Sequence, residues 1–145
     1  MVNLIFSKQL PAYSLQQTAK DNMTIDKFRF YNFRTYRSAK NLHIKLLKVV
    51  NEFDNAYYYL SSQLKRASLS VVLNIAEGSG KDSDKDFRRY IQNSLGSINE
   101  VAACLDIAYQ IGLIKKLDFD NLIDDCFDVK NQLGSFSKKL KEAVS

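Results

Sequence analysis

Apolar residues recur every three or four positions along most of the chain beyond residue 25, which is the spacing of amphipathic helices. The pattern predicts four helices. They span about Asp26–Phe53, about Asn55–Glu77, Ser83 to Gly112, and a last stretch that begins near Asp118. Residues 1–24 contain Pro11 and show no clear period, so an extended or partly ordered N-terminal arm is expected there.

Local features mark where these helices begin and end. Asp26 is a candidate N-cap of the first helix, and Ser83 with Asp86 forms a near relative of a capping box before the third. The glycines of Gly78–Gly80 suit the C-terminal end of the second helix. The third helix carries a heptad seam with alternating steps of four and three. Its members are Phe87, Ile91, Ser94, Ile98, Val101, Leu105 and Ala108.

Short connections between long helices favour antiparallel neighbours. The predicted fold class is therefore all-α, with residues 25–145 forming an antiparallel up-down-up-down four-helix bundle. One proline and five glycines argue against an all-β fold, which needs many turns. No apolar run approaches the roughly 20 residues of a membrane span, so we expect a cytoplasmic protein without a membrane partner.

The composition narrows the candidate chemistry. Cys104 and Cys126 are too few for a disulfide framework and are expected to be reduced and buried. The single histidine, His43, lies at the edge of the apolar side of the first helix and is expected to be a packing residue. Asn74 and Glu77 are expected to bond the turn or to tie the second helix to the third. Because no base–nucleophile pair or metal-ligand cluster emerges, we expect no cofactor, no metal and no enzymatic activity.

Charge is distributed unevenly along the chain, whose 21 basic and 16 acidic residues give a net charge of +5. Between Lys27 and Asn51 there are seven basic residues and no acidic one. Such a stretch suits a polyanion, because each cation can neutralise a phosphate, and Phe33 and Tyr36 could stack on bases. The alternative is a solvated face that pairs with acids of the last helix or of another subunit. Five cations cluster opposite the apolar stripe: Lys27, Arg34, Arg37, Lys45 and Lys48.

Two other features bear on partners. A second group of basic residues is expected around the junction of the second and third helices: Lys65, Arg66, Lys81, Lys85, Arg88 and Arg89. The glycines there lack the spacing of a P-loop, and they are expected only to reverse the chain. Opposite its heptad seam the third helix carries Arg89 and the small or apolar residues Gly96, Ala103 and Ile107, which predict a second contact surface. That surface packs either on a second neighbour within the bundle or on another subunit, and we expect self-association.

Leu64–Leu113 resembles the signature of the 23S rRNA intervening-sequence protein family. The residues that carry the resemblance are Lys65-Arg66-Ala67-Ser68, Asn74-Ile75-Ala76-Glu77-Gly78-Ser79-Gly80, Phe87, Arg89-Tyr90, Ser94-Leu95-Gly96-Ser97, Asn99-Glu100 and Gly112-Leu113. The helices on either side match more loosely. Two departures are a longer segment before Met23 and the lack of a proline in the loop 51–54.

The resemblance implies antiparallel four-helix bundles that assemble as homopentameric rings. Some members are encoded within intervening sequences of the large rRNA gene, and relatives include accessory variability determinants of diversity-generating retroelements, which bind nucleic acid and a reverse transcriptase. It implies no catalytic residues. We therefore expect a non-catalytic, nucleic-acid-binding oligomer that contacts RNA or DNA. The alternative is a protein-interaction scaffold, such as an accessory subunit of a retroelement reverse transcriptase or a ribosome-associated factor.

Overall fold

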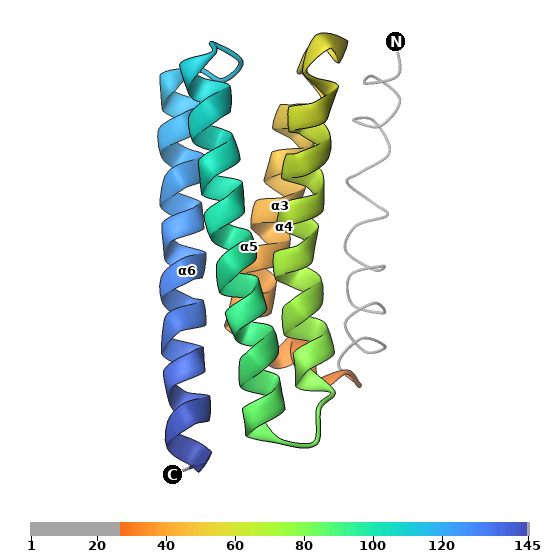
Figure 1. Ribbon diagram of the computed structural model, residues 1–145, viewed down its shortest axis with the longest axis vertical. Coiled ribbons are helices and arrows are strands. Elements are labelled where there is room, and N and C mark those ends of the chain that lie inside the picture. The colour runs from red at the N-terminus through yellow and green to blue at the C-terminus, as the bar shows by residue number, and fades with distance from the viewer. Residues whose placement is uncertain (1–26, 145) are drawn as a thin grey trace, which may run out of the picture.

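The structure is a computed structural model that describes residues 27–144. The described residues form four long helices. Figure 1 shows that consecutive helices run in opposite directions. The predicted antiparallel four-helix bundle is confirmed, and the described residues form no strand. The helices are α3 (Arg34–Val50), α4 (Tyr58–Ser79), α5 (Asp84–Gln110) and α6 (Lys116–Val144), with short 3-10 helices η1 (Arg29–Asn32) and η2 (Asn55–Tyr57).

The first long helix begins later than the apolar period predicts. Asp26, the expected N-cap, lies outside the described residues, and α3 starts only at Arg34. Phe33 adopts an extended backbone, which places its ring against Phe87 and Phe136, at centroid distances of 5.8 and 5.0 Å. At Phe33, therefore, side-chain packing against α5 and α6 takes the place of the helical turn that the period predicts. The apolar period of residues 26–53 includes Phe28, yet its side chain is 58% exposed.

The core follows the predicted stripes closely in the middle of the bundle. All seven positions of the α5 heptad seam are buried. They face the buried residues of α4, which include a stripe at steps of three and four: Leu60, Leu64, Ala67, Val71 and Ile75. The polar member of the seam, Ser94, donates its hydroxyl hydrogen to the carbonyl oxygen of Val71 at 2.9 Å, which satisfies a group that would be costly to bury unpaired.

The turn between α4 and α5 differs in detail from the expected glycine cap. Gly80 has a φ of −89°, which needs no glycine, and Gly78 lies within the last turn of α4. A Cβ atom at Gly78 would lie 2.7 Å from both Phe87 Cδ2 and Tyr90 Cβ. Gly78 therefore permits the close approach of α4 to α5 rather than a reversal of the chain.

The ends of α5 match their sequence features. Ser83 is the N-cap: its Oγ accepts from the backbone N–H of Asp86 at 3.1 Å and donates to the Asp86 carboxylate at 2.9 Å. At the other end Gly112 has a φ of +83°. The N–H of Leu113 donates to the carbonyl of Ala108 at 2.9 Å, which is the hydrogen bond of a Schellman motif.

Both cysteines are free and buried. Burial raises the pKa of the Cys126 thiol to about 12 and also raises the pKa of Cys104. Because the thiolate is the reactive form, both side chains act as small apolar groups.

In the described part of the chain no helix is long and apolar enough to cross a membrane.

Candidate nucleic-acid interface

The outward face of α3 is a cationic surface. Arg34, Arg37 and Lys48 are exposed along this helix, and Lys27 is exposed in the turn before it. Within residues 27–144, no acidic side chain lies within ion-pair distance of these four. Arg37 donates to the carbonyl oxygen of Tyr31 at 2.9 Å, which holds its guanidinium near the start of the helix. We call Lys27, Arg34, Arg37 and Lys48 the α3 basic face.

Lys45 has a different environment from the other cations of this helix. Its Nζ lies 2.6 Å from Asp125 Oδ2 of α6, in a pair whose side chains both remain partly exposed. The interpretation that the basic helix pairs with acids of the last helix is therefore right for this one residue. An exposed pair of this kind contributes about 0–1 kcal/mol. It involves Lys45 alone, so the α3 basic face remains available to a ligand.

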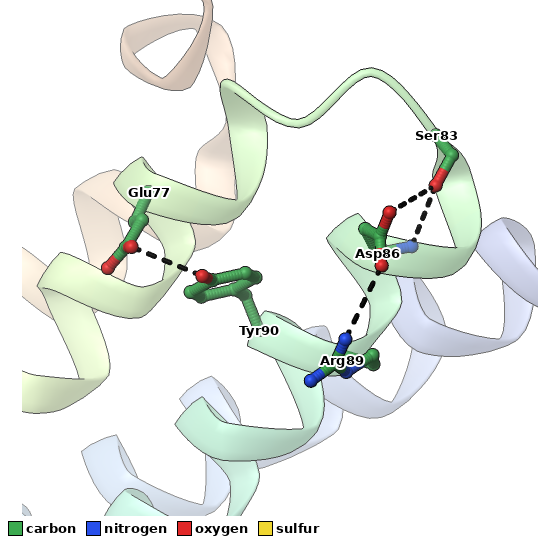
Figure 2. Close-up of polar contacts among 5 residues, drawn as sticks. All are labelled: Glu77, Ser83, Asp86, Arg89 and Tyr90. Atoms are coloured by element: carbon green, nitrogen blue, oxygen red, sulfur yellow. Dashed lines mark hydrogen bonds and ion pairs between the residues drawn. The ribbon is translucent and has the colours of Figure 1, made fainter.

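The second predicted group of cations is only partly assembled. Lys81, Lys85, Arg88 and Arg89 lie at the α4–α5 turn and the start of α5, whereas Lys65 and Arg66 lie about 20 Å away along α4, at 1.5 Å per residue. Figure 2 shows Arg89 directed toward Asp86, with Nη1 and Oδ1 3.5 Å apart. The Lys81 ammonium lies 5.0 Å from the centre of the Tyr90 ring.

The two aromatic residues expected to stack on bases are not free to do so. The Phe33 ring packs in the core between Phe87 and Phe136. Tyr36 is half-buried against Phe30, with ring centroids 4.6 Å apart, and burial raises the pKa of its hydroxyl. The exposed aromatic residue near the α3 basic face is Phe28. One sequence feature could have indicated this exposed ring. Five aromatic residues lie between positions 28 and 36, in a stretch without acids.

Polar side chains line the contact between α4 and α5. The Asn74 amide donates to the carbonyl oxygen of Ser70 at 2.9 Å and accepts a long hydrogen bond of 3.5 Å from Asn93. The Tyr90 hydroxyl donates to Glu77 Oε1 at 3.2 Å (Figure 2). Asn74 and Glu77 thus connect the two helices. This arrangement suits the tying role expected for both residues.

His43 lies between α3 and α4, where its Nδ1 is 2.7 Å from the hydroxyl oxygen of Ser68. The Ser68 hydroxyl also donates to the carbonyl oxygen of Lys65 at 3.2 Å, so the pair belongs to the helix packing. Burial lowers the pKa of His43. Among the described residues no group of three or more His, Cys, Asp or Glu side chains could hold a metal ion.

The back of α5 is open to solvent. Gly96, Ala103 and Ile107 are all exposed, and Ile107 retains 48% of its accessible surface. A Cβ atom at Gly96 would meet no atom within 4 Å, so packing within the subunit does not require a glycine there. Leu73 on the neighbouring α4 is also 54% exposed.

The residues that build this bundle also identify its family. The sequence model of the family described as 23S rRNA-intervening sequence protein matches residues 31–135, which is more than half of the chain. The chain belongs to this family. The match covers α3, α4 and α5 with their connecting turns and most of α6, so the α3 basic face beyond Lys27 and the α4–α5 contact both lie within it.

A solved structure from the S23 ribosomal protein family of Bacteroides thetaiotaomicron has the same fold. It is described as a protein with unknown function, with a TM-score of 0.68 and 19% sequence identity, and the alignment covers 72% of this chain and 98% of that chain. At this identity the likeness establishes the four-helix-bundle fold alone. A search of curated proteins finds no match.

Proposed function

We propose that this 23S rRNA-intervening sequence protein is a non-catalytic, nucleic-acid-binding subunit of a homo-oligomer. The observation that carries the proposal is the α3 basic face, whose four cations are exposed and lack an acidic partner among residues 27–144. A solvated helix face normally mixes charges of both signs, because opposite charges three or four residues apart stabilise it. Arg34 and Arg37 are three residues apart with no acid beside them in the sequence, whereas Lys48 has Glu52 four residues on. A chain of phosphates would relieve the repulsion between the two arginines.

The exposed surface on α4 and α5 supports the oligomeric part of the proposal. Apolar or small residues are exposed there: Leu73, Ile107, Ala103 and Gly96. A second helix could approach closely at Gly96. Burial of such surface between copies of the chain would be favourable at about 25 cal/mol per Å². Five subunits are the number that the family resemblance implies.

A salt titration tests the nucleic-acid part. The dissociation constants of the full chain for a single-stranded RNA and for an RNA duplex are measured by fluorescence anisotropy at several salt concentrations. We expect steep weakening with salt. The triple variant Arg34→Glu, Arg37→Glu and Lys48→Glu should lower affinity for both RNAs at least about tenfold and reduce the slope by roughly 2 to 3.

A matched control carries the same change in charge on another part of the bundle. The control is Lys130→Glu, Lys138→Glu and Lys141→Glu, three exposed lysines of α6. It should retain most of the affinity. Binding that ignores both salt and the α3 triple variant would refute the proposal. Recovery of one protein partner by the α3 basic face after nuclease treatment, without RNA binding, would favour the scaffold alternative instead.

A further inference from the structure

Aromatic rings form a connected group where the chain enters α3. The Phe28 ring stacks on Phe30, with centroids 5.6 Å apart and an interplanar angle of 30°. Phe30 in turn contacts Tyr36 at 4.6 Å. Tyr31 lies beside them, since the Lys40 ammonium is within 5.4 Å of the centre of its ring and 5.6 Å of the centre of Tyr36. We call Phe28, Phe30, Tyr31 and Tyr36 the aromatic cluster.

The cluster has one strongly exposed ring and a cationic border. Phe28 retains 58% of its accessible surface although it is wholly apolar. Lys27 precedes it in sequence, and Lys40 and Arg37 both contact Tyr31. In this part of the chain, therefore, an exposed aromatic surface and positive charge occur together.

We infer that Phe28, supported from behind by the other rings of the aromatic cluster, stacks on an unpaired base of a single-stranded nucleic acid. This inference rests on the proposed nucleic-acid function and specifies the form of nucleic acid. Surfaces that bind single strands combine cations along the backbone with aromatic rings under the bases. In a duplex the faces of the bases are covered by their neighbours, so Phe28 would have nothing to stack on.

The charge around the exposed rings distinguishes this cluster from an ordinary apolar patch. Phe127 on α6 is exposed to a similar degree, 61%, but its helix carries both acids, Asp124 and Asp128, and a cation, Lys130, beside it. Those acids would repel the phosphates on either side of a stacked base, whereas Lys27, Arg37 and Lys40 would attract them. Phe127 is therefore a matched control: the same side chain at similar exposure where the surrounding charges are mixed.

The test compares Phe28→Ala with Phe127→Ala in the full chain. The probes are a single-stranded RNA of about 12 nucleotides, within the site sizes of such surfaces, and a duplex of the same length. Single strands that carry 2-aminopurine report stacking through their fluorescence. We expect Phe28→Ala to weaken single-strand binding at least about fivefold and to reduce the 2-aminopurine response. Duplex affinity and the salt slope should not change, because no charge is removed.

The possible results separate this inference from the proposed function. If the wild type binds RNA with the expected salt dependence but Phe28→Ala binds single strands like the wild type, stacking is refuted and the proposed function stands. Equal weakening of single-strand and duplex binding, or an equal effect of Phe127→Ala, would also refute stacking. Absence of binding by the wild type at low salt, both to these RNAs and to DNA strands of the same sequences, would refute both. Thermal unfolding of each variant verifies that the bundle is intact.

Discussion

Gly78 lies at a close contact between α4 and α5, and its lack of a side chain matters for stability. In Gly78→Ala the new Cβ would overlap Phe87 in the core and Tyr90 at the surface. We expect a loss of about 1–3 kcal/mol in the free energy of unfolding. Denaturant unfolding measures it. Gly134→Ala on α6, where a Cβ meets nothing within 4 Å, should instead stabilise the protein by about 0.5–1 kcal/mol. Equal effects of the two substitutions would contradict this account.

His43 makes stability depend on pH in a defined direction. Burial lowers its pKa from the ordinary value of 6.5, so the unfolded chain binds a proton at a higher pH than the folded chain. The stability that neutral His43 contributes is complete above pH 6.5 and is lost as pH falls through that value toward the folded-state pKa. We expect the free energy of unfolding to decline between pH 7.5 and 5.5 in the wild type and less in His43→Gln, measured by urea unfolding at each pH. Parallel curves would contradict the prediction.

At the scale of a single helix, the N-cap of α5 contributes to the stability of the protein. Ser83 satisfies the N–H of Asp86 and also bonds the Asp86 carboxylate (Figure 2). Ser83→Ala should therefore cost about 1 kcal/mol in stability, measured by thermal unfolding. Ser62→Ala is the control, because Ser62 is exposed within α4 and alanine is the better helix former. A loss as large at Ser62 as at Ser83 would argue against capping as the cause.

The helices also indicate which parts of the fold could be predicted from sequence. The sequence predicts every position of the heptad seam of α5, because regularly spaced residues of one helix lie on one face of it. It does not predict the start of α3, because the Phe33 ring contacts Phe87 and Phe136, which are remote in sequence. A helical period in one segment carries no information about such contacts.

The same limit applies to the candidate interface as a whole. Cations on one helix can be grouped from their spacing, and Arg34, Arg37 and Lys48 are indeed exposed together on α3. The pairing of Lys45 with Asp125, 80 residues away, depends on how α3 packs against α6. Their place in the sequence suggests that Lys65 and Arg66 lie near the α4–α5 turn. The length of α4 instead places both residues about 20 Å from that turn.

For the whole molecule, the open back of α5 predicts the state of assembly. We expect light scattering to give the wild type a mass of at least twice the 16.6 kDa of one chain. Ile107→Glu should shift the mass toward the monomer, because a charge would then replace an exposed apolar side chain where a second copy packs. Phe127→Glu is the control, because it makes the same kind of change at an exposed ring of α6, and it should leave the mass unaltered. A wild type that is monomeric at micromolar concentration would refute self-association, and Gly96, Ala103 and Ile107 would then be no more than a solvated surface.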